Sequence, residues 1–446
     1  MKQFAIFYKS FYLTRRFYFI GAAIALLFAV SFYMSALEEL AKIFLVFLSI
    51  VVLIDLMLLY TRNSITAQRI CLPRFSNGDE NKVTIVIQNN YTFTVQLTLI
   101  DELPAQFQQR NWHRNLSVPE RSETTLIYIL QPFERGEYNF GNILALIKSP
   151  LQLVQRRYSI EAAQVVNVYP SYVQMRRYSL LGVSNQAQEA GAKRLRKLGQ
   201  SVEFEQIKDY VRGDDYRTVN WKASARKGQL MVNTFVDEKS QQVYCLIDKS
   251  RSMKMPFAGL TLLDYAINAT LVLTNVALQK QDKAGLITFA QKVDTFVHAE
   301  RKPAQMEAVL EALYKQQTKF PDPDYESLYA YIRSRIKQRS LLVLFANFES
   351  LYSLQRQMPY LRKIAHYHLL MVVFFENTEI NSLLQKDAIN TEEIYIQTIA
   401  EKFAFDKRQM VKELNQQGIL AVLTAPEKLT VNAMNKYLEV KAKQMI

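Results

Sequence analysis

The chain has 446 residues and a formal net charge of +14, so it is long enough for more than one domain and its charge favours an anionic partner. Its two cysteines, Cys71 and Cys245, form no CxxC pair and its four histidines form no HExxH motif, which excludes a disulfide framework and disfavours a zinc hydrolase. None of its glycines lies in a GxGxxG, GxxxxGK[ST] or GxSxG motif, which excludes the usual phosphate-binding loops and the nucleophile elbow.

Two apolar segments, 17–37 and 43–60, lie near the N-terminus. Each is long enough to cross a hydrocarbon layer of about 30 Å, so we expect an N-terminal arm and a transmembrane hairpin within residues 1–62. A cleaved signal peptide is the alternative for the first segment, but a second apolar run follows it directly. The outer flanks are basic and the turn between the segments contains Glu38 and Glu39. The positive-inside rule therefore predicts a two-pass protein with both termini in the cytoplasm.

Asp55 lies inside the second apolar segment. An acid in such a segment is by default a functional candidate. It is also within about a turn and a half of the cytoplasmic end, where its carboxylate reaches headgroups or a partner helix. We favour this second role.

Residues 63–170 have the pattern of short strands. Alternating runs rich in β-branched residues, such as 82–87, 93–99 and 124–130, are separated by turn residues. The economical interpretation of the first two runs is a pair of short strands joined by a turn. We expect an antiparallel β-sandwich of immunoglobulin type. Such a module is a spacer or a docking unit, and peptide or lipid recognition is the alternative.

A joining segment follows at 171–241, and its sharpest feature is a basic cluster: Lys193, Arg194, Arg196 and Lys197. Nucleic-acid binding is one interpretation, since the cluster can neutralise phosphates. No aromatic ladder or helix-turn-helix pattern accompanies it, and the inner surface of a membrane is anionic. We therefore predict a lipid-facing loop and disfavour nucleic acid.

The same segment ends in a dense polar signature. It alternates acids, bases and aromatic residues: Tyr210, Gly213, Asp214, Asp215, Arg217, Trp221, Lys222, Ser224 and Arg226. The glycine permits a tight turn and the carboxylates can accept from backbone N–H groups or arginines. We expect an ion-paired network, with Trp221 packed inside it, that fixes the joining segment on the next domain. The alternative is that Asp214 and Asp215 act as an acid/base pair.

From 242 to 446, predicted strands alternate with predicted helices. The strands fall at 243–247, 284–289, 341–345, 369–375 and 419–423, and helices fall at 262–279, 306–314 and 328–336. This alternation predicts a Rossmann-like α/β domain with a mostly parallel sheet. Ligands of such sheets bind at the carboxyl ends of the strands, where Asp248 follows the first strand.

Asp248, Ser250 and Ser252 form a DxSxS motif at this edge. A carboxylate and two hydroxyls are hard oxygen ligands suited to Mg²⁺, and the motif is the metal-ion-dependent adhesion site pattern of the von Willebrand factor A fold. Two further ligand positions depart from that pattern. Asn347 stands where an acid is expected after a later strand, and residues 321–327 contain no threonine; Asp324 or Glu349 is the substitute. The alternative is that the serines cap the next helix and Asp248 joins the signature's arginines.

The signature itself carries a family resemblance. Residues 210–226, with Pro170, Asp324-Tyr325-Glu326 and the strand at 339–345, resemble the bacterial family called domain of unknown function 58. The resemblance implies a membrane-anchored protein of the bacterial inner membrane that ends in a von Willebrand A-like domain. It also implies a MoxR-type AAA+ ATPase as partner, with von Willebrand A-domain paralogues as further partners, in protein maturation or envelope stress tolerance.

These observations lead to one leading hypothesis and two rivals. We expect a non-catalytic membrane scaffold that docks a MoxR-type ATPase or a client protein through the α/β domain. One rival is a metal-dependent hydrolase that uses Asp248 with Asp214 or Asp215. The other is nucleic-acid binding through the basic cluster at 193–197.

Overall fold

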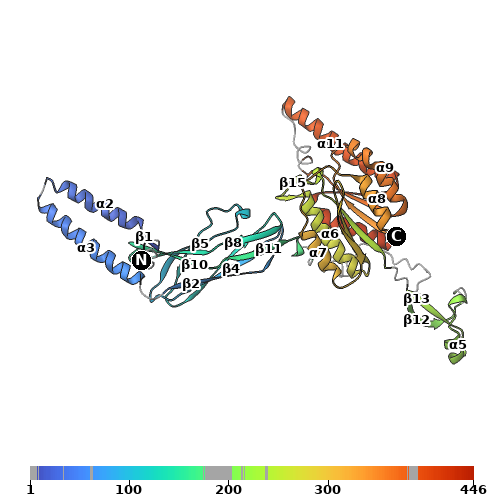
Figure 1. Cartoon of the computed structure of the whole chain (residues 1–446), viewed down its shortest axis with the longest axis horizontal. Coiled ribbons are helices and arrows are strands. Elements are labelled where there is room, and N and C mark those ends of the chain that lie inside the picture. The colour runs from blue at the N-terminus through green and yellow to red at the C-terminus, as the bar shows by residue number, and fades with distance from the viewer. Residues whose placement is uncertain are drawn as a thin grey trace. The chain divides into compact units, whose positions relative to one another are not determined.

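The computed structural model of the chain describes residues 8, 10–33, 35–60, 64–173, 175, 203–211, 214, 216–236, 240–378, 380 and 390–445. The chain forms two compact units, Met1–Tyr169 and Pro170–Ile446, coloured from blue to cyan-green and from green to red in Figure 1. We call them the β unit and the α/β unit.

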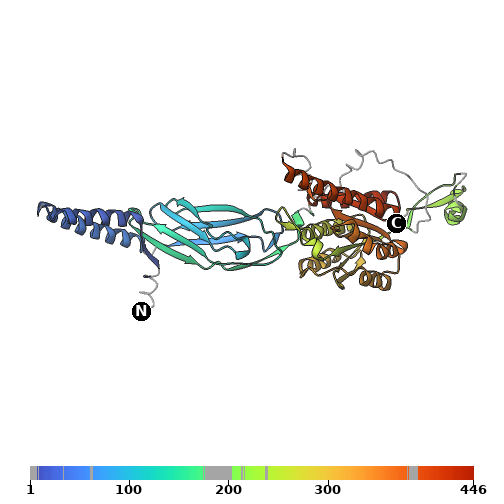
Figure 2. The same cartoon turned by 90° about the horizontal axis from the view of Figure 1, so that it is seen from above.

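Two apolar helices lie between the first strand of the β unit and the others: α2 (Arg15–Val30) and α3 (Ser35–Leu59). They lie side by side (Figures 1 and 2). Among the described helices, one is long and apolar enough to cross a membrane, and its Leu37–Leu59 stretch fits a membrane anchor or a signal sequence by length and composition. The turn predicted around Glu38 is wrong, because the helix already begins at Ser35. Glu38 and Lys42 form a 2.9 Å ion pair one turn apart, which stabilises a helix instead of ending it.

Asp55 connects α3 to the strands and is fully buried. Its carboxylate accepts hydrogen bonds from the Ser149 hydroxyl and from the backbone N–H groups of Leu151, Leu153 and Val154, the latter three at 3.3, 3.1 and 3.2 Å. The partner of this acid is therefore the turn between two strands of the same unit, instead of the headgroup or helix that the sequence suggested. The last turns of α3 are fixed to the β unit.

The β unit contains three sheets. The first has the order β1-β10-β9-β5-β6, the second β3-β11-β8 and the third β2-β4-β7. The strands are β1 (Phe11–Leu13), β2 (Ile65–Cys71), β3 (Arg74–Ser76), β4 (Asn81–Asn89), β5 (Val95–Asp101), β6 (Arg114–Val118), β7 (Glu123–Leu130), β8 (Gly136–Phe140), β9 (Ile143–Lys148), β10 (Val154–Ile160) and β11 (Gln164–Tyr169).

One apolar core joins the inner faces of these sheets. In β4, Val83, Ile85 and Ile87 are buried while alternate residues are more exposed, as expected of a strand with one covered face. The runs at 82–87 and 93–99 correspond to β4 and β5, but these strands lie in different sheets. Their connection therefore crosses the core instead of closing a hairpin.

The signature region forms a small substructure at the start of the α/β unit (Figure 1). Strands β12 (Glu203–Asp209) and β13 (Met231–Val236) pair with each other, and the short helix α5 (Trp221–Lys227) lies between them in sequence. The α5 helix begins where the Asn220 side chain accepts from the Ala223 N–H at 3.0 Å. It ends at Gly228, whose φ of +69° favours glycine.

The rest of the α/β unit is built on a six-stranded sheet with the order β18-β17-β14-β19-β20-β21. Its strands are β14 (Gln242–Asp248), β17 (Lys283–Phe289), β18 (Val293–Glu300), β19 (Leu341–Phe345), β20 (Leu369–Phe375) and β21 (Leu420–Thr424). All neighbouring pairs are parallel except β17 and β18. The sheet is therefore mostly parallel, as the alternation predicts, with one antiparallel edge strand that the sequence did not indicate.

Helices cover both faces of this sheet (Figures 1 and 2). They are α6 (Leu262–Gln279), α7 (Gln305–Tyr314), α8 (Tyr325–Arg335), α9 (Leu351–Tyr367), α11 (Thr391–Gln416) and α12 (Leu429–Ala442), and a short ribbon of β15 (Pro256–Phe257) and β16 (Leu260–Thr261) precedes α6. In β14, Val243, Cys245 and Ile247 pack with α6, α7 and α12. The alternate residues Tyr244 and Leu246 pack with α8, α9 and α11. Burial on both faces explains why the strands are continuously apolar.

Candidate functional site

The central strand β14 lies where the chain changes direction across the sheet. If the six strands are numbered 1 to 6 in the order in which they occur in the chain, starting at β14, their order across the sheet is 3-2-1-4-5-6. The second strand, β17, and the fourth, β19, therefore flank β14 on opposite sides. The carboxyl edge at such a switch point is the usual ligand position of open α/β sheets. Asp248 ends β14 and Asn347 follows β19, so the fold brings these two predicted site residues to the same edge.

Asp248 is a buried carboxylate, 1% exposed. Its Oδ1 accepts from the Ser250 N–H at 2.8 Å, and its Oδ2 accepts from the Tyr325 hydroxyl at 3.3 Å. Burial raises the pKa of Asp248 to about 6, although the hydrogen bonds from Ser250 and Tyr325 act in the opposite direction. Tyr325 is the first residue of α8. From the sequence it was part of the family motif Asp324-Tyr325-Glu326 and was not predicted to contact Asp248.

The other predicted ligands turn toward protein partners. The Ser250 and Ser252 hydroxyl oxygens are 3.2 Å apart. Asn347 donates from Nδ2 to the Ser252 carbonyl at 3.1 Å. Asp324 is the N-cap of α8 and accepts from the N–H groups of Glu326 and Ser327 and from the Ser327 hydroxyl. These hydrogen bonds lower the pKa of Asp324 and occupy its oxygens.

Lys407 on α11 is the residue of this site that the sequence did not reveal. Its ammonium donates to Asn347 Oδ1 at 2.9 Å and to the Phe348 carbonyl at 2.7 Å. Burial lowers the pKa of Lys407 to about 8, and nearby Glu349 opposes the shift. The oxygen of Asn347 that could face a metal ion is therefore already bound to a fixed cation.

Two cavities adjoin at this edge. A polar cavity of about 140 Å³ is lined by Asp248, Ser250, Arg251, Ser252, Asp322, Pro323, Tyr325, Asn347, Phe348, Glu349, Ser353, Arg356 and Gln357. A larger and mostly apolar cavity of about 410 Å³ includes Asn347, Glu349 and Lys407 in its lining, together with Phe257, Phe375 and Phe403. A side chain or peptide segment of a partner that filled both cavities would need a polar group for the smaller cavity and an apolar part for the larger one.

This set of oxygens fits a divalent cation poorly. It has two carboxylates, Asp248 and Asp324, whose oxygens already receive protein donors. The neighbouring amide oxygen of Asn347 is bound to an ammonium. Within the described part of the chain, no group of three His, Cys, Asp or Glu side chains could hold a metal ion. Hard cations such as Mg²⁺ require several free anionic or carbonyl oxygens. Mg²⁺ binding at Asp248, Ser250, Ser252, Asp324 and Asn347 stays a prediction that this geometry does not favour.

The signature residues make local contacts within their substructure. Asp214 accepts from Lys208 Nζ and from the Val211 N–H, both at 3.0 Å, and the Val211 bond, followed by Lys208, lowers the pKa of Asp214. Ser224 Oγ accepts from the Met231 N–H at 2.9 Å. These bonds fix the hairpin, and no described contact joins Asp214 to Asp248.

The remaining signature residues are more exposed than the predicted network required. Trp221 is 72% exposed, so the prediction that it packs inside a network is wrong. Lys222 and Arg226 are exposed on α5, the guanidinium of Arg217 lies 5.8 Å from the centre of the Tyr216 ring, and the Tyr210 N–H donates to the Leu230 carbonyl at 2.9 Å. Gly213, Asp215 and the basic cluster at Lys193, Arg194, Arg196 and Lys197 lie outside the described residues.

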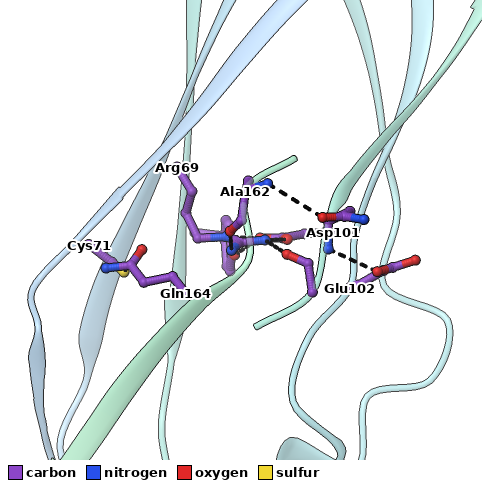
Figure 3. Close-up of polar contacts among 9 residues, drawn as sticks. Arg69, Cys71, Asp101, Glu102, Ala162 and Gln164 are labelled. Atoms are coloured by element: carbon purple, nitrogen blue, oxygen red, sulfur yellow. Dashed lines mark hydrogen bonds and ion pairs between the residues drawn. The ribbon is translucent and has the colours of Figure 1, made fainter. Parts of the chain in front are cut away.

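A second buried polar cluster lies in the β unit (Figure 3). Arg69 donates to both oxygens of Asp101, to the Ala162 carbonyl at 2.6 Å and to the Gly141 carbonyl at 3.1 Å. The Tyr128 hydroxyl also donates to Asp101. Since the ion pair is buried and its hydrogen bonds are satisfied by neighbouring strands, we assign it a structural role.

Comparison with known proteins finds one family model that matches part of the chain. Residues 206–383 match the family described as protein of unknown function DUF58, which includes the signature hairpin and the strands β14 to β20. The uncharacterized protein YeaD of Bacillus subtilis (strain 168) is 27% identical over 219 residues, 47% of this chain and 54% of YeaD. The chain therefore matches about half the length of this curated relative.

Likeness to solved structures is weak. The CARDB domain of a Pyrococcus furiosus protein, crystallised with di-metal ions, has a TM-score of 0.18 and 13% identity, over 24% of this chain and 88% of that one. Proximal thread matrix protein 1 from the mussel byssus has a TM-score of 0.28 and 10% identity, over 45% of both chains. Likenesses at this level carry no functional inference.

Proposed function

We propose that this chain is a membrane-anchored docking protein without catalysis of its own. In this proposal the α/β unit is a von Willebrand A-like domain, and its carboxyl edge binds a MoxR-type AAA+ ATPase or a client protein. The observation that carries the proposal is the contact between Lys407 and Asn347. It puts a fixed ammonium where metal-dependent chemistry would need a free oxygen, and so favours recognition by protein groups.

The membrane part of the proposal combines the sequence with the junction at Asp55. Helix α2 is 16 residues long and begins with two basic residues, Arg15 and Arg16. Helix α3 contains the longer apolar stretch, Leu37–Leu59. Both ends of this helix pair approach the β unit, since Thr14 donates to Leu153 through its backbone at 3.1 Å and Asp55 binds the same turn. A two-pass anchor with both termini in the cytoplasm of a bacterial inner membrane accounts for these contacts.

The β unit then acts as a rigid base. Its sheets share one core, which is compatible with an immunoglobulin-like sandwich. The Leu59 carbonyl at the end of α3 accepts from the Tyr91 hydroxyl and from Arg156, both at 2.9 Å. Because the helix end and the strands share these bonds, the end of α3 is fixed to the base.

The experiment uses the full chain in neutral-lipid nanodiscs and a MoxR-type ATPase from the same organism. We expect the ATPase to co-purify in the presence of a non-hydrolysable ATP analogue. Arg251 is exposed and lines the polar cavity, so Arg251→Glu should weaken the association about tenfold or more, as truncation or reversal of an interface arginine commonly does. Lys280→Glu, an exposed lysine at the end of α6, is the matched control.

Two outcomes would contradict the proposal. One is that no ATPase is retained although the chain is folded. The other is a robust turnover by the chain alone in phosphoesterase or peptidase assays that is lost in Asp248→Ala, because that result would favour the metal-dependent hydrolase.

A further inference from the structure

The C-terminal ends of α8 and α9 carry an unusual concentration of positive charge. Between Glu326 and Glu376 the only acid is Glu349. Six exposed basic residues lie toward the ends of the two helices and just after α8, and we call them the basic face: Arg333, Arg335, Lys337, Arg339, Arg362 and Lys363. Among the described residues, none of the six forms an ion pair with a carboxylate.

The basic face is separate from the candidate site. Helices α8 and α9 end just before β19 and β20 begin, so these ends lie at the amino edge of the parallel strands. Asp248 and Asn347 lie at the carboxyl edge. A partner on the basic face would therefore contact a different side of the α/β unit from the one proposed above.

The positive charges of the basic face act on a buried histidine beside them. His368, at the end of α9, is 5% exposed, and its Nδ1 has no hydrogen-bond partner among the residues that the structure describes. Burial lowers the pKa of His368, and the positive charges of Arg333 and Arg339 lower it further. Cations at helix C-termini interact favourably with the helix dipole. This interaction explains why one or two cations lie at each helix end, but not all six. Like charges on one face repel one another. Since none of the six has a carboxylate partner among the described residues, an anionic partner would relieve that repulsion.

Three of the cations lie over aromatic rings, and Arg335 is the most distant, 5.9 Å from the centre of the Tyr331 ring. The guanidinium of Arg333 lies 3.8 Å from the centre of the Tyr367 ring. The ammonium of Lys363 lies 5.6 and 5.5 Å from the rings of Tyr329 and Tyr360. Cation–π contacts fix the position of a charge but leave its N–H donors free for a carboxylate. The face is therefore preorganised for an acidic ligand.

A groove of about 660 Å³ runs through this face. Its lining combines the apolar or aromatic residues Tyr329, Met358, Pro359 and Tyr367 with the cations Arg362 and Lys363. His366 and Gln355 also line it, and Gln355 donates to Glu413 of α11 at 2.9 Å. Pro359 lies inside α9 and adds an apolar ring to the groove.

We propose that the basic face and its groove form a docking surface for an acidic, amphipathic segment of a partner protein. The cations bind its carboxylates and the groove takes its apolar side chains. A flat lipid surface would contact exposed charges but would not fill a groove. A nucleic acid would need free aromatic faces for base stacking, whereas Arg333 and Lys363 already occupy faces of these rings. The inference goes beyond the docking of an ATPase at the carboxyl edge and does not depend on it.

The test uses the full chain in neutral-lipid nanodiscs and a fluorescent helical peptide with glutamates flanking a leucine stripe. Anisotropy measures its affinity near physiological salt. The double variant Arg333→Glu/Lys363→Glu should weaken the affinity about tenfold or more, because reversing charges at a complementary surface replaces attraction by repulsion. Met358→Ser leaves the net charge unchanged. It should weaken the peptide affinity about threefold or more, because it removes apolar contact in the groove.

The matched control is Lys292→Glu/Lys319→Glu, which changes the net charge equally through two exposed lysines elsewhere on the α/β unit. It should leave the peptide affinity within about twofold, since charges beyond a Debye length are screened. Equal losses in both double variants, or no effect of Met358→Ser, would overturn the proposal. All substituted positions except Met358 are exposed, and unchanged melting of each variant shows that folding is intact.

Two further probes separate the other anionic partners. Vesicles of phosphatidylcholine with phosphatidylglycerol, and a single-stranded RNA oligonucleotide, are added to the same nanodiscs. The proposal is wrong if the peptide does not bind the wild-type chain but the vesicles or the RNA do, and Arg333→Glu/Lys363→Glu abolishes that binding. The basic face would then bind lipid or RNA. Peptide binding without ATPase binding would contradict only the proposed function, and the reverse result only this inference.

Discussion

Asp101 of the β unit and Asp248 of the α/β unit are both buried carboxylates, 3% and 1% exposed. Asp101 is neutralised by Arg69 and also receives the Tyr128 hydroxyl. Asp248 receives only neutral donors, Ser250 N–H and Tyr325 hydroxyl, in its described contacts, and burial raises its pKa. The comparison separates two uses of a buried acid. A buried acid that is paired with a cation has a structural role. A buried acid without a cation, at the carboxyl edge of a sheet, destabilises the folded state, and such acids are typical of functional sites.

Breaking the sealed pair should have the largest effect. Arg69→Met leaves Asp101 charged and buried without its cation, so we expect the β unit to lose about 3–5 kcal/mol of unfolding free energy. Native-state hydrogen exchange of the amides in β7 and β9 measures this change locally. Lys82→Met, at an exposed position of β4, is the control and should have little effect. A loss below 1 kcal/mol, well short of the ~3 kcal/mol minimum expected for a buried pair, would show that Arg69 and Asp101 are not a sealed ion pair.

Removing the unpaired charge should act in the opposite direction and depend on pH. The folded pKa of Asp248 is about 6, above the ordinary aspartate pKa of 3.8, so the folded state binds the proton more tightly than the unfolded state does. Stability from this group is highest below the unfolded pKa and is lost as the pH rises through the folded pKa. The loss is about 3 kcal/mol, at about 1.4 kcal/mol per pKa unit.

Asp248→Asn removes this titration. We expect the α/β unit of the variant to be more stable than wild type at pH 8 by about 2–3 kcal/mol and nearly equal at pH 4. Denaturant dependence of hydrogen exchange in β14 and β19, in EDTA-containing buffer, checks this. The same profile with Mg²⁺ added gives the metal test. If Mg²⁺ stabilises wild type strongly at pH 8 and leaves Asp248→Asn unchanged, the site holds a cation in spite of its geometry.

A third buried acid, Asp55, sharpens the comparison, because its partners are neutral but numerous. Asp55→Ala leaves the backbone N–H groups of Leu151, Leu153 and Val154 without their acceptor. We expect a local loss of about 2 kcal/mol, as is typical of buried donors left unsatisfied. Faster hydrogen exchange at these amides, with no change in the α/β unit, is the readout. Ser49→Ala in the exposed middle of α3 is the control.

The smallest effect is expected for Trp221, which is 72% exposed. Trp221→Ala should change the stability of the α/β unit by less than about 0.5 kcal/mol, as for other surface substitutions. Thermal unfolding measures it beside Ser224→Ala, which removes the acceptor of the Met231 N–H and should cost about 1 kcal/mol. If Trp221→Ala destabilises more than Ser224→Ala, the tryptophan packs in solution as the signature first suggested.

Much of the α/β unit could be predicted from local patterns. The apolar runs at 243–247, 341–345 and 369–375 correspond to β14, β19 and β20, because a strand buried on both faces must be apolar throughout. The edge strand β18 was missed, since its burial is only partial. The long helix α11 was missed as well, and its many exposed apolar residues give a weak periodic signal.

The site was predictable only in part. The sequence predicted Asp248 at the carboxyl edge of a buried strand, and it is the last residue of β14. Ligand binding at this edge stays a prediction. The partners of the site residues could not be predicted, because Lys407 is 60 residues from Asn347 and Tyr325 is 77 residues from Asp248. The signature's acids and bases suggested a cross-domain network, yet Asp214 pairs with Lys208, six residues away. Spacing in sequence does not specify which of several bases an acid contacts.

Four features could be inferred from the amino-acid order alone: the apolar N-terminal segments, the strand-rich region, the alternation of strands and helices, and the basic balance of charge. Each of these depends on local composition and periodicity, which act over a few residues. Tertiary structure decided that Asn347 binds Lys407, that Asp55 holds a strand turn, and that Arg333 stacks on Tyr367. These contacts follow from strand order and helix packing, which bring distant residues to the same edge or face.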